Sequence, residues 1–191
     1  MIQAIVFDCF GVLAEDGWLP FKKQYIGEDS TLAQEIADLG KQNEHGFIDN
    51  DAHTQQVSQR LGVTQETYLR AVGRQVPNQE LFSYIQQELK PHYKIGLLSN
   101  ANYDVLSDLF TVDQAALLDA SALSYECRLI KPDPHMYHLI AERLGVAPEA
   151  CVYIDDVERY CTAAQDVGMQ TIVHTDNSAT IAAIQQILTA K

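Results

Sequence analysis

Five residues suited to catalysis or metal binding stand directly after short apolar runs of the chain. They are Asp8, Ser99, Lys131, Asp155 and Asp156. If those runs are parallel strands, the five side chains meet at the carboxyl edge of one sheet, where open α/β sheets bind ligands. One strand that ends in an acid is weak evidence, because such an acid is often only a helix or turn cap. Four endings in the order acid, hydroxyl, lysine and paired acids favour a functional site.

These side chains could divide nucleophilic attack, charge neutralisation and metal binding among them. The ionised carboxylate of Asp8 closes the first apolar run and can attack a phosphorus centre directly. Ser99 can donate a hydrogen bond, and Lys131 can place a positive charge beside phosphate oxygens. The carboxylates of Asp155 and Asp156 are ligands that Mg²⁺ favours. The free amides of the turn after Asp8 can cradle a phosphate.

The elements that would position these residues alternate between strand and helix after residue 77. Apolar stretches that favour strands lie at 2–7, 94–98, 117–123, 129–130, 151–154 and 170–173. Apolar residues at helical spacing lie within 81–89, 105–110, 136–144, 163–167 and 181–188. This alternation predicts a parallel sheet that helices cover on both faces.

Residues 15–76 break the alternation. They contain no convincing strand pattern, and the stretch 32–39 has one apolar helical face. Asp49 and Thr64 are expected to cap the starts of two further helices. An all-helical insertion directly after the first strand would hang over the carboxyl edge of the sheet, where a lid belongs.

The composition indicates a globular and strongly acidic chain. Of its 191 residues, 47% are hydrophobic, and the formal net charge is -13. This charge argues against nucleic acid and anionic membranes as partners. The apolar run 2–7 has no basic flank of the kind a signal peptide carries, and no run approaches the roughly 20 residues that span a bilayer. The four scattered cysteines favour free thiols, and hence a cytoplasmic protein.

Together, the four motifs resemble those of the haloacid dehalogenase superfamily of hydrolases. The matching segments are residues 7–13 (FDCFGVL), 97–100 (LLSN), 130–134 (IKPDP) and 153–156 (YIDD). Their order and spacing fit that superfamily, and the helical insertion is similar to the cap that its members carry after the first motif. Each motif alone is weak, whereas the four together are specific, and the resemblance covers essentially the whole chain.

The resemblance implies an α/β fold with a Rossmann-like core and a small all-helical cap. The core would comprise residues 1–14 and 77–191, and the cap residues 15–76. The core sheet would have five parallel strands in the order 5-4-1-2-3. The first and fourth motifs would then flank a topological switch point of the sheet, which suits metal and phosphate binding.

The resemblance also implies roles for single residues. The catalytic residues would be Asp8 as the nucleophile, Ser99 and Lys131. The ligands of a Mg²⁺ cofactor would be Asp8, the backbone carbonyl of Phe10, Asp156, and Asp155 directly or through water. The residues in contact with the substrate would be Cys9, Phe10 and Asn100. The expected partner is a small phosphorylated molecule, and the protein is expected to be a monomer or a homodimer.

Phe10 departs from the usual pattern of phosphatases in this superfamily, which carry an aspartate two residues after the nucleophile. That aspartate protonates the leaving group and later activates water, and general acid–base catalysis is worth ~10²–10⁴ in rate. Three functions remain open. The first is a phosphatase for esters with good leaving groups, or with an acid from elsewhere. The second is a 2-haloacid dehalogenase, and the third a non-catalytic phosphate-binding protein. Candidates for a substitute acid or base are Glu15, Asp16 and His45.

The paired acids Asp155 and Asp156 favour the phosphatase. The dehalogenase branch typically has an aromatic residue at the position of Phe10, but it needs no metal and typically has a serine-rich fourth motif. The segments 129–137 and 153–156 are more similar to a branch that includes sugar-1-phosphate phosphatases, some of which also lack the second aspartate. We therefore rank a Mg²⁺-dependent phosphatase with an aspartyl-phosphate intermediate first, and a dehalogenase second.

Overall fold

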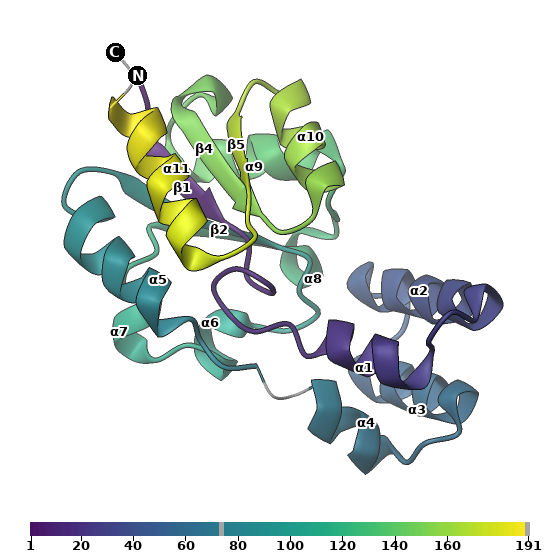
Figure 1. Cartoon of the computed structure of the whole chain (residues 1–191). Helices are drawn as coiled ribbons and strands as arrows, with labels where there is room; N and C mark the ends of the chain where they lie inside the picture. Colours follow the sequence, from purple (N-terminus) through teal and green to yellow (C-terminus); the bar gives the residue numbers. More distant parts are fainter. Residues whose placement is uncertain (73–74, 190–191) are drawn as a thin grey trace.

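The computed structural model describes residues 1–72 and 75–189, apart from the side chain of Leu19. Residues 73–74 of the predicted insertion and 190–191 of the predicted core lie outside the described residues. Figure 1 shows an α/β body and, beside it, a group of helices that the chain enters directly after its first strand.

The body is built on a sheet of five parallel strands in the order β3-β2-β1-β4-β5. The strands are β1 (Ala4–Phe7), β2 (Lys94–Ser99), β3 (Ala120–Leu123), β4 (Cys151–Asp155) and β5 (Gln170–Val173). Seen from the other edge, this is the order 5-4-1-2-3, so the predicted topology is confirmed. Every residue of the central strand β1 is buried. The strand order reverses at β1, because β2 and β3 lie on one side of it and β4 and β5 on the other. Such a switch point creates a binding crevice at the carboxyl ends of the strands.

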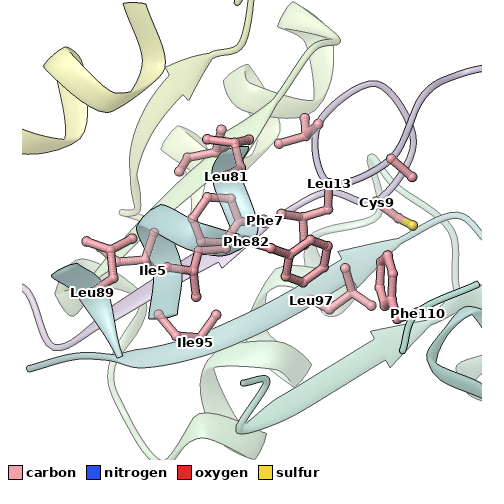
Figure 2. Close-up of a cluster of buried hydrophobic side chains, with 14 of the residues drawn as sticks. Ile5, Phe7, Cys9, Leu13, Leu81, Phe82, Leu89, Ile95, Leu97 and Phe110 are labelled. Atoms are coloured by element: carbon pink, nitrogen blue, oxygen red, sulfur yellow. The ribbon is translucent and has the colours of Figure 1, made fainter. Parts of the chain in front are cut away.

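The side chains of β1 alternate between two apolar clusters, one on each face of the sheet. The helices of the body are α5 (Gln79–Tyr84), the π-helical η1 (Ile85–Leu89), α6 (Val105–Asp108), α7 (Val112–Ala115), α8 (Ser124–Cys127), α9 (Pro134–Leu144), the 3₁₀-helical η2 (Pro148–Ala150), α10 (Glu158–Asp166) and α11 (Asn177–Thr189). Ile5 and Phe7 share a cluster with residues of α5, η1 and α11 (Figure 2). Ala4 and Val6 share the other cluster with residues of α9 and α10. Helices therefore cover both faces, as predicted.

The strand predicted at Leu129 and Ile130 is wrong. Both residues lie with Lys131 in the loop between α8 and α9. Two apolar residues shortly before a proline are too few for a strand, which usually has three residues or more. Arg128 ends α8 in the left-handed conformation, with φ 56°. The chain then continues as a loop, and this loop, not the end of a strand, carries Lys131.

Two further predicted elements are shorter than expected. The helix expected over 105–110 is α6, because Thr111 already caps α7 by exchanging hydrogen bonds with Gln114. The strand expected within 117–123 is confined to β3, because Leu117 and Leu118 still belong to the turn that follows α7. In both places the apolar pattern continues through a turn whose side chains pack partly buried against the core.

Four helices lie within the described residues of the predicted insertion. They are α1 (Trp18–Tyr25), α2 (Ser30–Glu44), α3 (Asn50–Leu61) and α4 (Gln65–Val72). Their buried apolar side chains form a cluster of their own, made of Phe21, Ile26, Ile36, Leu39, Val57 and Tyr68. The predicted capping residues Asp49 and Thr64 accept amide hydrogen bonds from the first turns of α3 and α4. Within the described part of the chain, no helix has the length and apolarity needed to cross a bilayer.

The chain connects these helices to the body at residues 14–15 and 76–77, and the two connecting segments lie side by side. The amide of Glu15 donates to the carbonyl of Val76 at 3.0 Å, and Ala14 and Pro77 form an isolated antiparallel bridge. We propose on this ground that residues 15–76 form a helical cap on a core of residues 1–14 and 77–191.

Candidate active site

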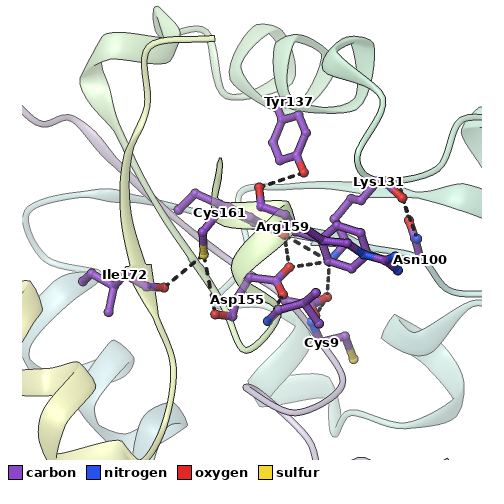
Figure 3. A network of polar contacts seen from close by, with 12 residues as sticks. Cys9, Asn100, Lys131, Tyr137, Asp155, Arg159, Cys161 and Ile172 are labelled. Carbon is purple, nitrogen blue, oxygen red and sulfur yellow. Dashed lines mark hydrogen bonds and ion pairs between the residues drawn. The ribbon is translucent and has the colours of Figure 1, made fainter. Parts of the chain in front are cut away.

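Lys131 lies between the carboxylates of Asp8 and Asp155 at the carboxyl edge of the sheet. Its Nζ is 2.8 Å from Asp8 Oδ1 and 2.7 Å from Asp155 Oδ2. Figure 3 shows Lys131 reaching Asp155 from its loop. Phe7 and Ile154 are paired in β1 and β4, so the acids that follow them stand side by side. All three charged side chains are buried.

The carboxylate of Asp155 is fixed through both of its oxygens. Oδ2 accepts hydrogen bonds from Lys131 and from the hydroxyl of Tyr153, and Oδ1 accepts one from the amide of Val157 at 2.8 Å. Lys131 also contacts the Tyr153 hydroxyl, at 3.0 Å. Burial raises the pKa of Tyr153 well above its usual value, so the phenol stays a neutral donor. This network holds the ammonium group of Lys131 beside Asp8.

Asp156 completes a group of three carboxylates with Asp8 and Asp155. One oxygen from each lies within 4.8 Å of the others. Gly11 has φ +85°, and a Cβ there would lie 2.5 Å from Asp156 Oδ2, so glycine permits this close approach. The backbone carbonyl of Phe10 accepts no hydrogen bond from the described residues. Carboxylate and carbonyl oxygens are the ligands of hard divalent cations, so this donor set fits such a metal.

The site carries a surplus of negative charge. Burial raises the pKa of Asp8 to about 7, while Lys131 lowers it and Asp155 raises it further. Burial and the charge of Asp155 also raise the pKa of Asp156. Burial lowers the pKa of Lys131, but Asp8 and Asp155 outweigh that effect, so its pKa is raised and it stays charged. Three carboxylates facing one ammonium group would be balanced by a divalent cation.

Ser99 is the last residue of β2 and Asn100 follows it, at the same edge of the sheet. Ser99 Oγ is buried and has no hydrogen-bond partner among the described residues, and a buried hydroxyl of this kind calls for a ligand. The side chain of Asn100 accepts from the Lys131 amide at 2.7 Å and donates to the Lys131 carbonyl at 3.2 Å. Asn100 therefore anchors the loop that carries Lys131, and its contact with a substrate stays a prediction.

Cys9 and Phe10 form the turn after the nucleophile candidate. The amide of Cys9 donates to Asp8 Oδ1 at 2.7 Å, while its thiol is buried in the core cluster. Burial raises the pKa of that thiol, so it stays protonated. The ring of Phe10 is partly buried, 6.3 Å from the ring of Tyr103. The substrate contacts of Cys9 and Phe10 stay predictions.

The structure separates the three candidates for a substitute acid or base. Glu15 is exposed, and His45 stacks on Phe47 with ring centroids 5.5 Å apart. Asp16 accepts a hydrogen bond from the amide of Trp18 at 2.7 Å, and its charge contributes to the raised pKa of Asp156. Of these three candidates, Asp16 is thus the one whose charge acts on a carboxylate of the site.

A cavity of about 890 Å³ opens beside Lys131, between the helices α2, α3 and α4 and the body. On the body side it is lined by Asn100, Lys131 and Tyr160, and on the other side by residues of α2, α3 and α4. The volume falls in the range of ~300–1,000 Å³ that is typical of small-molecule sites. It exceeds what a 2-haloacid of a few heavy atoms requires.

The motifs, the sheet topology and the geometry around Lys131 agree with the resemblance. The profile of the haloacid dehalogenase-like hydrolases matches residues 2–168. The chain belongs to this family. The inferred resemblance is confirmed, and the protein is a hydrolase.

Relatives of this hydrolase span almost its full length. The phosphatase MT3486 of Mycobacterium tuberculosis is 27% identical over 186 residues, which cover 88% of this chain and 85% of that protein. A predicted HAD-like hydrolase from Porphyromonas gingivalis is 25% identical, with a TM-score of 0.74 and 100% of both chains covered. The HAD family enzyme bt-2542 from Bacteroides thetaiotaomicron, in complex with magnesium and inorganic phosphate, is 23% identical and has a TM-score of 0.71, covering 95% of this chain and 99% of that chain. At this identity, the last likeness shows the fold alone.

Sequence reasoning missed several residues that line the cavity of this haloacid dehalogenase-like hydrolase. They include Glu44, His53, Arg159 and Tyr160. Arg159 and Tyr160 follow the fourth motif closely, and this proximity was a usable signal, because the first turn of the next helix starts at the same sheet edge. No comparable signal exists for Glu44 and His53, which lie on α2 and α3.

Proposed function

We propose that this hydrolase is a Mg²⁺-dependent phosphatase that acts on a small phosphomonoester through an aspartyl-phosphate on Asp8. Sugar 1-phosphates are the substrate type that we favour. The observation that carries the proposal is the contact of Lys131 with both Asp8 and Asp155, with Asp156 completing the group of three carboxylates. A carboxylate nucleophile, a fixed positive charge and a cation-binding group are what phosphoryl transfer needs.

The proposed reaction has two steps at Asp8. In the first, an oxygen of Asp8 bonds to phosphorus, and the ester oxygen departs with its electron pair and takes a proton from water. In the second, water attacks phosphorus and the bond to Asp8 breaks. Inorganic phosphate is released, and a proton of the attacking water passes to the solvent. Lys131 lies 2.8 Å from Asp8 Oδ1 and would stabilise the charge on the phosphoryl oxygens. The unpartnered Ser99 hydroxyl would donate to one of them.

Asp8, Asp156 and the Phe10 carbonyl would hold the Mg²⁺ ion. Asp155 already bonds to Lys131 and to the Val157 amide, so we place it as a direct or water-mediated ligand. Bound Mg²⁺ supplies positive charge that offsets the phosphoryl group and the surplus carboxylates. Two comparisons support the proposal: bt-2542, which shares the fold, has been crystallised with magnesium and phosphate, and the relative MT3486 is named a phosphatase.

Phe10 supports a preference for esters with good leaving groups. Without a carboxylate at this position, the leaving oxygen departs unaided by the residue that usually protonates it. Sugar 1-phosphates and aryl phosphates release more stable anions than primary alcohols do. We therefore expect them to be hydrolysed faster than sugar 6-phosphates. If primary-alcohol phosphates prove the best substrates, another residue supplies the proton, and Asp16 is the first one to test.

Hydrolysis of a 2-haloacid is the second candidate, and the aromatic Phe10 near Tyr103 favours it. In that reaction Asp8 would attack carbon and displace halide. Asp156 would then have no evident role, and the cavity of about 890 Å³ would be oversized. Binding of phosphate without catalysis ranks third. A cytoplasmic location and a monomeric or homodimeric state stay predictions.

One screen separates these functions. The purified protein is assayed against sugar 1-phosphates, sugar 6-phosphates and aryl phosphates, each with Mg²⁺ and with EDTA, and against 2-haloacids for halide release. Phosphate release that requires Mg²⁺ supports the phosphatase. Halide release that EDTA does not affect supports the dehalogenase, and no turnover of any compound favours a binding protein.

A further inference from the structure

Two polar side chains on the cap side of the cavity have no partner within the described part of the chain. Glu44 is the last residue of α2, and His53 lies in the first turn of α3. Both line the cavity that also contains Lys131. Among the described residues, neither side chain forms a hydrogen bond or an ion pair, and the His53 ring meets only the edge of Tyr68, at 6.2 Å between centroids.

Several other polar residues of the cavity wall are already bonded. Asn43 donates to Asn50 Oδ1 and accepts from the amide of Asn102. Gln75 accepts from the hydroxyl of Tyr103. The contacts with Asn102 and Tyr103 join residues 15–76 to the body across the cavity. Their polar groups are used by the fold, whereas Glu44 and His53, like the hydroxyls of Thr54 and Tyr68, have no partner among the described residues and can interact with a ligand.

The surroundings of Glu44 and His53 define what such a ligand would offer. Burial raises the pKa of Glu44 to about 7, against the lowering effects of Lys131, Arg159 and Lys41. Burial lowers the pKa of His53, so its imidazole is neutral near pH 7, with one donor and one acceptor nitrogen. A partly buried carboxylate such as that of Glu44 is unfavourable without hydrogen bonds, and a ligand that donates to it would offset that penalty.

We propose that Glu44 and His53 bind the hydroxyl groups of the substrate's organic part, so that the substrate is a phosphorylated sugar or polyol. A carboxylate accepts hydrogen bonds from hydroxyls, and a neutral imidazole exchanges one in either direction. A second anionic group would be repelled by Glu44, and an ammonium group would face Lys131, Lys41 and Arg159. The inference rests on the proposed phosphatase function and assigns the residues that contact the organic part of its substrate.

The test compares Glu44→Ala and His53→Ala with the wild type on four kinds of ester. The panel contains hexose and pentose 1-phosphates, glycerol phosphate, phenyl phosphate and phosphoethanolamine. Glu35→Ala is the matched control, because Glu35 lies on the same helix, is exposed and pairs with Arg60 at 3.1 Å. Thermal unfolding of each variant shows that it is folded.

We expect Glu44→Ala to raise KM for the best hydroxylated ester by ~10–100-fold, as the loss of a hydrogen bond to a charged group predicts. His53→Ala should act in the same direction with a smaller effect. For phenyl phosphate, which has no hydroxyl, both variants should stay within about twofold of the wild type. The control should match the wild type on every ester.

Three outcomes overturn the inference while the phosphatase proposal survives. They are an equal loss on phenyl phosphate, no loss on any hydroxylated ester, and phosphoethanolamine as the best substrate. If the wild-type protein hydrolyses none of the esters with Mg²⁺ present, the phosphatase proposal itself fails, and this inference fails with it.

Discussion

The polar side chains proposed to act at the end of the sheet and on the cap side of the cavity differ in whether they are hydrogen-bonded within the protein. At the sheet end, Lys131 contacts Asp8, Asp155 and Tyr153, and Asp155 is fixed through both oxygens. On the cap side, Glu44 and His53 line the same cavity without a bonded partner among the described residues. A fixed network positions reacting charges before substrate arrives, which is how enzymes stabilise a transition state at little reorganisation cost.

Ser99 differs from Asp155 and Lys131 at the sheet end, because its side chain is not hydrogen-bonded to any described residue. Its hydroxyl is buried there without a partner among the described residues. In both regions, then, we propose substrate contacts for polar side chains without a partner among the described residues: Ser99 for a phosphoryl oxygen, and Glu44 and His53 for hydroxyls. Changes at the sheet end should therefore affect all substrates, and changes on the cap side only some.

The largest effect is expected from Asp8→Asn. The amide keeps the shape of the side chain but is a far weaker nucleophile, so kcat should fall by ~10⁴-fold or more while the fold is retained. Steady-state kinetics on the best phosphate ester measures the loss, and circular dichroism checks the fold. Asp166→Asn, an exposed position on α10, is the matched control. Full turnover by Asp8→Asn would show that the proposed nucleophile is wrong.

Loss of the metal should come next. EDTA should abolish phosphatase activity and added Mg²⁺ should restore it, because the three carboxylates at the site need a compensating cation. Asp156→Ala should lose ~10²–10³-fold in kcat, and saturating Mg²⁺ should not restore it. Titration of activity against Mg²⁺ concentration measures both effects. Activity that survives EDTA in the wild type would contradict the metal site.

A gain is expected from Phe10→Asp. Hydrolysis of the aspartyl-phosphate lacks its usual base in the wild type, so a burst of leaving-group release should precede a slower steady state. An aspartate at this position should speed the second step by ~10-fold or more if the backbone carbonyl keeps its place. Stopped-flow measurement with an aryl phosphate separates the two phases. If every rate is unchanged, another residue already fulfils the role.

The smallest effect concerns the stability of the cap side. Because the pKa of Glu44 is raised from 4.5 to about 7 in the folded protein, the folded state binds more protons than the unfolded state between these values. Its contribution to the free energy of unfolding therefore falls as pH rises from 4.5 to 7. Glu44→Gln removes this titration. The free energy of unfolding of Glu44→Gln minus that of the wild type should therefore rise by ~1 kcal/mol from pH 4.5 to pH 8.

Urea denaturation of the wild type and of Glu44→Gln at both pH values measures that gain. The cations whose charges act on Glu44 are Lys131, Arg159 and Lys41. Glu35→Gln on the exposed side of α2 serves as the control. A difference in unfolding free energy that does not change with pH would show that Glu44 is not buried enough to hold its proton.

The apolar pattern predicted a parallel sheet and the residues gathered at its edge, and the resemblance to the family supplied the strand order. Parallel strands end at the same edge, so Asp8, Ser99 and Asp155 meet wherever their strands pair in register. Lys131 was placed correctly although its supposed strand is a loop, because the reciprocal hydrogen bonds with Asn100 hold that loop against the end of β2. The motif was informative even where the predicted secondary structure was wrong.

The tertiary structure alone decided which residues of the cap helices line the cavity beside Lys131. On α2 and α3 many polar residues occur at helical spacing, and sequence periodicity does not distinguish a side that meets solvent from one that meets another part of the protein. That choice depends on how the cap helices pack around Phe21 and Tyr68 and on contacts distant in sequence, such as that between Asn43 and Asn102. Glu44 and His53 become recognisable only when those contacts place them in the cavity of Lys131, because burial and proximity are properties of the folded chain.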